Sequence, residues 1–344
     1  MSKATVSAGL ARSYYEFAVA RGAHAEALAA RCGVDPLLVA DADDRVPFAK
    51  YVALVRAGKA LTNDPALPMH FAEAVDMAEF SVVGLLANAA ETMMDSFIQL
   101  NRYGQLVVEV DIGASNASHG GRFAYEFKET GAWLIDTRKD PNDFPELTES
   151  TFTRMITGPR RFLPRPHVLE VHVTHPEPAH RAEYDRIWQC PITFNSHWNA
   201  MRMDESLRTH RVRLQPRYVF GVLSAHADQL LKELENSKTT RGRVESLLMP
   251  ILHTGEISMD TIAGKMNQSR QTLYRSLKEE GVTFEQVIDD LRHKLALHYL
   301  AGKKVSVNET AYLVGFSDPA SFSRAFKRWT GVSPRDVRLA RAAE

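Results

Sequence analysis

The C-terminal part of the chain contains one structural pattern twice. The first copy runs from Ile257 to Leu277 and the second from Val305 to Phe326. Each combines a short helical pattern, a tight turn and a second helix with a basic outer face. This is the layout of a helix-turn-helix, whose second helix enters the major groove of DNA. Two copies in one chain could contact two adjacent segments of the groove without a dimer.

Charge is distributed unevenly along a chain whose formal net charge is zero. Residues 240–344 carry 16 Lys and Arg against 12 Asp and Glu, and residues 1–239 carry 26 against 30. This asymmetry indicates a basic DNA-binding part attached to an acidic body. The length of 344 residues indicates about two domains.

Cysteine usage and hydropathy exclude several classes of protein. Two cysteines, Cys32 and Cys190, are too few for a disulfide framework or a Cys-rich zinc site. The N-terminus lacks the apolar core of a signal peptide, and the longest apolar stretch, Phe80–Ala87, is too short to span a bilayer. We therefore expect a cytoplasmic protein with no membrane partner.

The hydrophobic periodicity predicts an α+β chain: a mixed α/β N-terminal domain, then an all-α domain with two helix-turn-helix units. The expected boundaries are 1–215 for the first domain, 216–239 for an interdomain helix and linker, and 240–344 for the second. Predicted strands are 106–112, 122–127, 132–136, 168–173 and 192–195. Predicted helices of the body are 14–21, 48–61, 93–103, 147–157 and 216–234, and a further one opens at Asp35–Pro36. Residues 235–240 are polar and form the best linker candidate.

In the first helix-turn-helix unit, Ser269 is a good N-cap for the second helix. The predicted inner residues are Ile262, Ala263, Met266, Leu273 and Leu277. The outer face carries Gln271, Tyr274, Arg275 and Lys278. Arg can bind guanine, and Gln can bind adenine, through two hydrogen bonds. Arg270 and Lys278 are better placed to contact phosphates, which fix the position of the protein on DNA but carry no sequence information.

The second unit carries sharper local signals. Ser306 with Glu309 forms a capping box, Gly315 allows a tight turn, and Asp318 with Pro319 opens the next helix. Gly331 marks the end of that helix. The predicted inner residues are Ala311, Leu313, Val314, Phe316, Phe322 and Phe326. The outer residues are Ala320, Ser323, Arg324 and Lys327, among which Arg324 is best suited to contact a base.

A continuous helix over 284–300 separates the two units. Its length of roughly 25 Å can hold two recognition helices near one turn of DNA apart, about 34 Å. The alternative is a plain helical bundle, because hairpins of two helices are common. The outward basic residues on both second helices weigh against it.

The segment Gly315–Pro334 resembles the C-terminal signature of AraC/XylS-type transcription regulators: Gly-Phe, then Phe-Ser-Arg-x-Phe-Lys-Arg, then Gly-x-Ser-Pro. Residues 258–281 are similar to the first unit of that family, and the resemblance covers about 240–340. It implies sequence-specific binding to promoter DNA and contact with RNA polymerase. The implied base-facing positions are Gln271, Tyr274, Arg275, Ala320, Ser323 and Arg324. Pro319 and Ala320 stand where polar base-contacting residues often occur, and Val337 stands where an aromatic is usual, so the second unit is expected to contact fewer bases.

The body resembles, more weakly, the arabinose-binding-like effector domain of many of these regulators. The similar pieces are 64–69, 80–86, 175–178, Tyr184 and 191–194. This resemblance implies a small-molecule effector, not necessarily arabinose, and we also expect a homodimer. The alternative is a regulator whose N-terminal domain only dimerises or binds a protein partner.

Other constellations carry little weight. The histidines 167, 172, 175, 180 and 197 cluster in the sequence, but neighbouring ones at odd spacing on a strand point to opposite faces. Trp133, Trp188 and Trp198 could line a ligand pocket, although core packing is favoured. An enzyme fused to a DNA-binding tail, such as a repair methyltransferase, would need a reactive, metal-supported cysteine cluster. We expect no catalytic residue, no metal and no cofactor.

Overall fold

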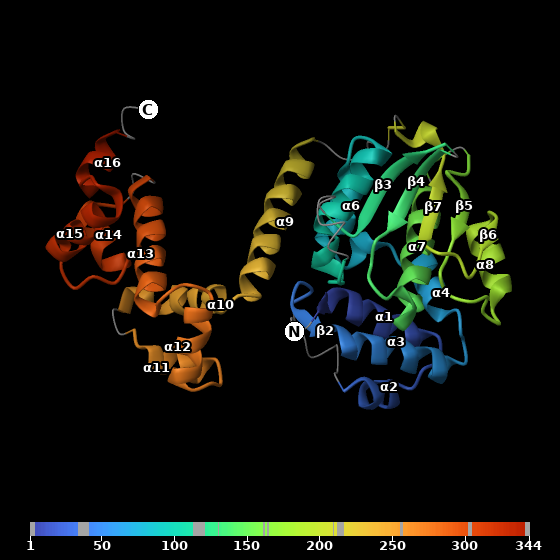
Figure 1. The fold of residues 1–344 in the computed structure, drawn as a ribbon, viewed down its shortest axis with the longest axis horizontal. Coiled ribbons are helices and arrows are strands. Elements are labelled where there is room, and N and C mark those ends of the chain that lie inside the picture. The colour runs from blue at the N-terminus through green and yellow to red at the C-terminus, as the bar shows by residue number, and fades with distance from the viewer. Residues whose placement is uncertain are drawn as a thin grey trace. The chain divides into compact units, whose positions relative to one another are not determined.

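The computed structural model describes residues 4–33, 41–112, 121–129, 131–160, 162–163, 165–208, 210–211, 217–254, 257–301 and 305–340. The chain divides into two compact units, Met1–Leu231 and Lys232–Glu344, coloured blue to yellow and yellow to red in Figure 1. The division falls inside one long helix, α9 (Arg217–Ser237). Each unit is described by itself.

Helices form most of the N-terminal unit. They are α1 (Ala8–Ala20), α2 (Ala25–Cys32), α3 (Phe48–Thr62), α4 (Leu67–Ala74), α5 (Val82–Ala89), α6 (Met93–Val107), α7 (Pro145–Arg160) and α8 (Arg181–Trp188), with single 3₁₀ turns η2 (Met77–Glu79), η4 (Pro141–Asp143) and η5 (Glu205–Arg208). Local chemistry fixes several helix starts, because Ser7, Ser81 and Thr92 each accept a backbone N–H at an N-terminus.

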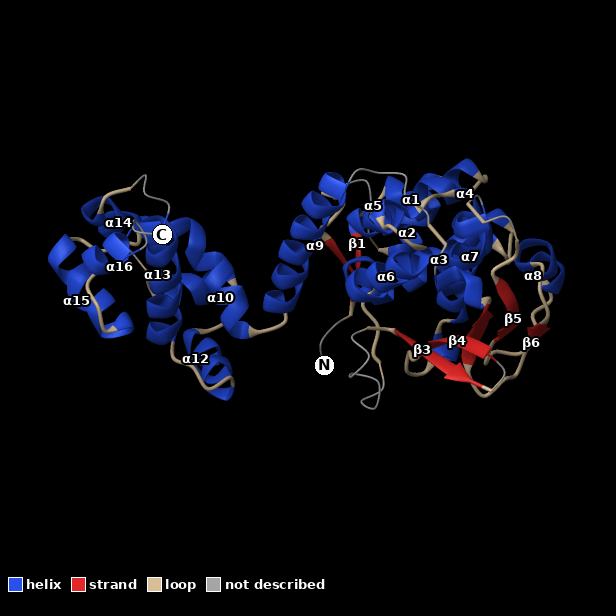
Figure 2. Ribbon diagram, turned by 90° about the horizontal axis from the view of Figure 1, so that it is seen from above, coloured by secondary structure: helices blue, strands red, loops and turns tan. Residues whose placement is uncertain are grey.

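A five-stranded sheet lies on one side of these helices (Figure 2). Its strands are β3 (Phe123–Lys128), β4 (Gly131–Asp136), β5 (Val168–His172), β6 (Ile192–Thr193) and β7 (Asn199–Met203), in the order β3-β4-β7-β5-β6. All neighbours are antiparallel except β5 and β6. The buried core joins α7, through Phe152 and Ile156, to Leu134 and Met201 on the facing side of the sheet. Two short strands, β1 (Thr5–Ser7) and β2 (Arg45–Pro47), form a separate pair.

The predicted strand at 106–112 is wrong. α6 continues through Val107, and Val108 and Ile112 make only isolated bridges. The capping box of Thr92 and Asp95 starts this helix, and its inner face buries Tyr103 and Leu106. Tertiary burial therefore outweighs the β propensity of the valines.

The other predicted strands and helices of the body coincide with observed elements, whereas β7 was not expected although it lies between β4 and β5. The predicted start at Asp35–Pro36 lies outside the described residues.

The C-terminal unit is helical. It contains α10 (Thr240–Leu248), the 3₁₀ segment η6 (Met249–Thr254), α11 (Met259–Lys265), α12 (Arg270–Glu279), α13 (Phe284–Ala301), α14 (Val307–Leu313), α15 (Pro319–Thr330) and α16 (Pro334–Ala340). The predicted polar linker at 235–240 is mostly helical, because α9 ends at Ser237 and α10 begins at Thr240 with Thr239 as its N-cap. The expected α+β class, with a sheet in the N-terminal unit and helices in the C-terminal unit, is confirmed.

Two hydrophobic cores lie along α13. The first packs Leu273 and Leu277 of α12 against α10, α11 and the early turns of α13. The second packs Phe322 and Phe326 of α15 against α14 and the last turns of α13. Within the described ranges, no helix is both long and apolar enough to cross a membrane.

Candidate functional site

The first helix-turn-helix unit consists of α11, a turn and α12. Serines cap both helices: Ser258 Oγ accepts the backbone N–H of Thr261 at 3.1 Å, and Ser269 Oγ accepts that of Thr272 at 3.1 Å. Ile262, Leu273 and the other predicted inner residues are buried or pack against the first core. The short polar side chains therefore fix where each helix starts, and the apolar ones fix which face of α12 remains outside.

The outer face of α12 is open to solvent. Gln271, Tyr274, Arg275 and Lys278 are all exposed, Tyr274 by 52%. Across the described part of the chain, none of these four side chains makes a hydrogen bond or ion pair. Arg270, at the first position of α12, forms an ion pair with Asp260 at 2.9 Å, with both side chains about two-thirds exposed (65% and 64%). Four polar side chains of α12 are thus available to an external partner.

The second unit is fixed by more bonds than the first. Ser306 and Glu309 form the predicted capping box, and Asp318 Oδ1 accepts the backbone N–H of Ser321 at 2.8 Å. The hydroxyl and amide of Ser321 lower the pKa of Asp318 from its usual value, so this cap is ionised at neutral pH. Pro319 occupies the first turn of α15, and Gly331 ends the helix with a φ of +80°.

The turn between α14 and α15 requires glycine at position 315. Gly315 has a φ of +81°, and a Cβ there would lie 2.0 Å from the carbonyl oxygen of Leu252. Arg292 of α13 donates to the carbonyl oxygens of Val314 at 3.1 Å and of Gly315 at 3.0 Å. Sequence reasoning identified Gly315 but missed Arg292, which carries no signal in the sequence because its partners are backbone atoms of another segment.

The outer face of α15 is less free than that of α12. Ala320, Arg324 and Lys327 are exposed, but Ser323 is half-buried and donates to the carbonyl of Pro319 at 2.9 Å. Arg324 donates to the hydroxyl of Ser321 at 2.8 Å.

The predicted inward orientation of Leu313, near the end of α14, is wrong. The side chain of Leu313 is 39% exposed, while Ala311 and Val314 are fully buried. Thr310 and Ala311 are the buried residues of this seven-residue helix, and Leu313 follows Ala311 by two residues, which places it on the other side.

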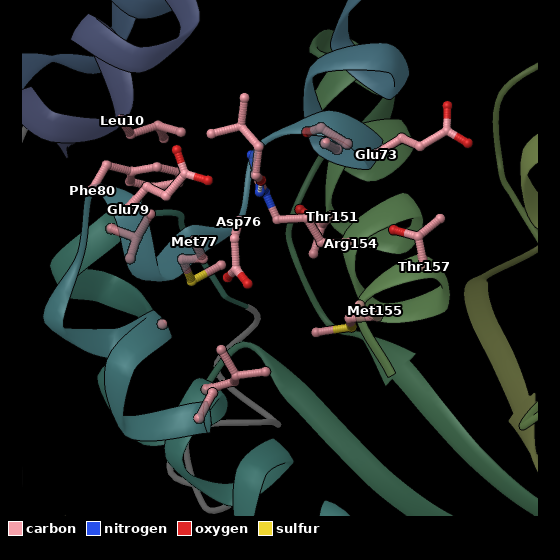
Figure 3. A pocket seen from close by; sticks show the side chains of 18 of the residues that line it. Leu10, Glu73, Asp76, Met77, Glu79, Phe80, Thr151, Arg154, Met155 and Thr157 are labelled. Carbon is pink, nitrogen blue, oxygen red and sulfur yellow. Dashed lines mark hydrogen bonds between the residues drawn. The ribbon is translucent and has the colours of Figure 1, made fainter. Parts of the chain in front are cut away.

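A separate feature lies in the N-terminal unit: a partly open cavity of about 360 Å³, lined mainly by α4, η2, α5, α6 and α7, with Leu10 of α1 and Tyr51 of α3 also in the lining. Figure 3 shows Arg154 projecting from α7 among the lining side chains, with Asp76 and Met77 near it. Most of the lining is apolar. The apolar lining includes Leu10, Phe71, Val75, Met77, Phe80, Met93, Phe97, Leu100, Leu147 and Met155.

The tryptophans do not line this cavity. Trp133 and Trp188 are buried, and Trp188 Nε1 donates to Thr153 Oγ1 at 2.9 Å within the core. The histidines that cluster in the sequence do not converge on one point either. His175 and His180 pack against Tyr184, whereas His172 and His197 pack against Trp198. Sequence reasoning did not single out Arg154, because the lining comes from seven elements, α1, α3, α4, η2, α5, α6 and α7, spread over the body.

Comparison with known families decides the identity of the chain. Residues 22–212 match the family model described as the arabinose-binding domain of AraC transcription regulators, and this match spans more than half of the chain. The chain belongs to the AraC family of transcription regulators. Residues 262–340 of this AraC-family regulator match a helix-turn-helix domain, which covers α12 and α15.

Relatives of this AraC-family chain are transcription regulators. The ornithine utilization regulator of Pseudomonas aeruginosa is 24% identical over 329 residues, covering 93% of this chain and 92% of that protein. The HTH-type transcriptional regulator VirS of Mycobacterium tuberculosis is 24% identical over 321 residues, covering 90% and 88%. The HTH-type transcriptional activator RhaS of Escherichia coli is 36% identical over 110 residues, which is 31% of this chain and 40% of RhaS. The chain is accordingly an AraC-type, DNA-binding transcriptional regulator.

Proposed function

We propose that this AraC-family regulator binds promoter DNA through α12 and α15, and that a small molecule held in the N-terminal unit changes that binding. The observation that supports the first part is the pair of capped, outward-facing helices on one helical scaffold. The observation that supports the second part is the mainly apolar cavity in the N-terminal unit. We propose three functional parts: an effector-binding and dimerisation domain at 1–215, a connecting segment at 216–239 and a DNA-binding domain at 240–344.

In the first unit, Gln271, Tyr274 and Arg275 contact base edges. Their exposure, and the lack of bonds to any described residue, leave their full hydrogen-bonding capacity for DNA. Lys278, at the far end of α12, contacts a phosphate. Arg270 does the same, because its exposed ion pair with Asp260 is worth little and a phosphate can replace it.

In the second unit, Arg324 is the main base-contacting residue. Its solvent-exposed bond to the Ser321 hydroxyl exchanges easily for a bond to a base. Ser323 and Ala320 face the groove but contribute less, because the serine hydroxyl is bound to its own helix and alanine has no polar group. Lys327, one turn further, contacts a phosphate.

The coupling between ligand and DNA binding requires an element that both sites influence. α6 is in contact with the proposed ligand site, because its residues Met93, Ser96, Phe97 and Leu100 line the cavity. The same helix holds α9: Asp228 accepts bonds from Tyr103 Oη at 2.7 Å and from Arg102 Nη2 at 2.8 Å. A ligand that shifts α6 therefore moves the attachment of α9, whose last residues belong to the C-terminal unit.

Further partners belong to the same proposal. The chain forms a homodimer through α9, whose Tyr218 and Val222 are 81% and 52% exposed. It contacts RNA polymerase at its promoters, and it catalyses no reaction. The exposed face of α9 also fits the alternative in which the N-terminal part only dimerises or binds a protein, without a small molecule.

One set of experiments separates these alternatives. Genome-wide mapping of bound sites gives a promoter fragment, and the metabolites of the neighbouring genes give a ligand panel. We expect at least one metabolite to raise the melting temperature of the full-length protein and to change its affinity for the fragment. Tyr103→Phe, which removes a hydroxyl bound to α9, is expected to preserve ligand binding and to reduce the change in DNA affinity. If no metabolite alters stability or DNA affinity, the alternative without an effector holds.

A further inference from the structure

Arg154 holds an unusual position in the cavity of the N-terminal unit. Its guanidinium lies over the rings of Phe71, at 4.8 Å, and Phe80, at 5.2 Å. Nη1 donates to the carbonyl oxygen of Val75, which precedes η2. The side chain therefore extends from α7 to the opposite wall of the cavity, as Figure 3 shows.

One nitrogen of this guanidinium is unsatisfied. Nη2 of Arg154 is shielded from solvent, and the described residues offer it no hydrogen-bond partner. A buried donor without an acceptor costs free energy, and more so when the donor is charged. Burial lowers the pKa of Arg154 to about 10, so the group still carries its charge at neutral pH. The cavity thus contains a positive charge with one hydrogen-bonding direction unused.

The surroundings limit which anion could use that direction. Arg154 is the one cationic side chain among the described residues that line the cavity, and no lysine joins it. Asp76, which caps η2 by accepting the N–H of Ala78 at 3.0 Å, and Glu79 both lie near enough to act on its charge. Glu73 also lines the cavity, but it is paired with Arg186 at 2.7 Å. A group with two or more negative charges, such as a phosphate monoester, would therefore meet one guanidinium and the two carboxylates of Asp76 and Glu79. A single carboxylate matches the guanidinium in charge and in shape.

The other lining residues favour a ligand whose part beyond the carboxylate is apolar. Phe97 and Leu100 from α6, Met77 from η2 and Met155 from α7 offer apolar surface around the guanidinium. The volume of about 360 Å³ is at the lower end of the range for ligand pockets, roughly 300–1,000 Å³. Both features suit a compact molecule without many hydroxyl groups.

We propose that the cavity binds a small monocarboxylic acid with an apolar body, whose carboxylate accepts hydrogen bonds from Arg154. This proposal rests on the proposed effector function of the N-terminal unit and specifies its chemical class. The apolar body lies against the methionines and phenylalanines of α6, η2 and α7. Because α6 also holds α9 through Tyr103 and Asp228, this ligand lies where it can act on the connecting helix.

The test uses the full-length protein and matched pairs of uncharged and charged probes. Hexanoate, octanoate, decanoate and 3-phenylpropanoate are each compared with the corresponding amide by thermal shift and calorimetry. The expected result is that at least one acid raises the melting temperature and binds at least tenfold more tightly than its amide. Since this comparison needs no variant, it remains valid even if substitutions at Arg154 disturb folding. Failure of all four acids to bind at millimolar concentration, or equal binding of acid and amide, overturns the proposal.

Substitutions test whether Arg154 is the residue that binds the carboxylate. Arg154→Gln is expected to weaken acid binding at least tenfold and to leave amide binding unchanged, and Arg154→Lys to restore part of the acid binding. Arg181→Gln is the matched control, since Arg181 is an ion-paired arginine on α8 outside the cavity lining. Ala87→Leu, which places a larger side chain in the lining, is expected to weaken acid and amide alike. Unchanged acid binding in Arg154→Gln would assign the carboxylate to another site.

The same protein separates this proposal from the effector function on which it rests. An acid that binds through Arg154 without changing affinity for the promoter fragment supports the carboxylate site and refutes effector control. An uncharged metabolite that binds in the cavity and changes DNA affinity, while no acid binds, refutes the carboxylate site and leaves effector control intact.

Discussion

In the first helix-turn-helix unit, Gln271, Tyr274, Arg275 and Lys278 on the outer face of α12 make no bond to any described residue. In the second unit, two of the three polar side chains on the predicted outer face of α15 are bound within their own helix. Ser323 donates to Pro319, and Arg324 donates to Ser321. The scaffolds beneath are closely similar: a serine- or aspartate-capped second helix, and two fully buried side chains four residues apart. Equal scaffolds can therefore carry unequal surfaces, and we assign most base recognition to α12.

The largest expected effect concerns whether the two hydrophobic cores of the C-terminal unit, one under each helix-turn-helix, fold separately. Phe326 is fully buried, and its ring lies 5.6 Å from that of Phe322. Phe326→Ala is expected to lower the free energy of unfolding of the second unit by about 3–5 kcal/mol, as large-to-small changes in cores do. Hydrogen exchange should then speed up for the amides of α14 and α15 more than for those of α12. Equal acceleration in both would mean that the two cores unfold as one.

Two glycines of the C-terminal unit allow a second comparison: Gly315 lies in the turn between α14 and α15, and Gly281 lies in the turn that follows α12. Gly315 and Gly281 both have positive φ, but only a Cβ at Gly315 would meet a neighbour, the carbonyl of Leu252. For Gly281→Ala the strained backbone costs about 1–3 kcal/mol. Gly315→Ala is expected to cost more than this, because the clash with backbone is added to the strain. Chemical denaturation of the two variants measures the difference, and a cost at Gly315 no greater than at Gly281 would contradict the close approach.

Local signals explain what could be predicted from the sequence. Ser269, the pair Ser306 and Glu309, and Asp318 act on backbone groups within three residues, so their roles follow from the sequence alone. The helical spacing of Leu273 and Leu277 likewise determines the inner face of α12.

Features that depend on distant segments could not be predicted in this way. The strand expected at 106–112 does not form: its first two residues end α6, where burial of the inner face outweighs local propensity, and Val108 and Ile112 make only isolated bridges. β7 was missed, since its residues Asn199–Met203 show no strict alternation and its place depends on pairing with β4 and β5. Arg292 and Arg154 bind backbone carbonyls far away in the sequence, so neither the turn support nor the cavity had a local signal. The assignment of base-contacting residues remains a prediction.

The next prediction compares the two arginines that we propose contact bases. Arg275→Ala is expected to weaken promoter binding by about 1–3 kcal/mol and to relax preference at one base pair. Arg324→Ala should act similarly at one base pair of the other groove segment, and Ser323→Ala should change binding little because its hydroxyl is bound to Pro319. Binding titrations against single-base variants of the promoter provide the measurement. A large effect of Ser323→Ala would show that its hydroxyl turns toward DNA.

The smallest expected effect is that of the phosphate contacts. Lys278→Ala and Lys327→Ala should each weaken binding to all sequences alike and reduce the slope of binding against salt by about one unit. Titrations at several salt concentrations, on promoter and on unrelated DNA, separate this behaviour from base recognition. Loss of preference at a particular base pair would instead place the lysine in the groove.

The unequal use of two recognition helices is the central claim, and a base-by-base substitution scan of a bound promoter tests it most directly. The 18 residues of α13 between the units span about 27 Å, which is close to one turn of DNA, about 34 Å. The scan should therefore show two sensitive segments about one turn apart, and Arg275→Ala should identify the more sensitive segment as that of α12. A single sensitive segment, or greater sensitivity in the segment that responds to Arg324→Ala, would contradict the account.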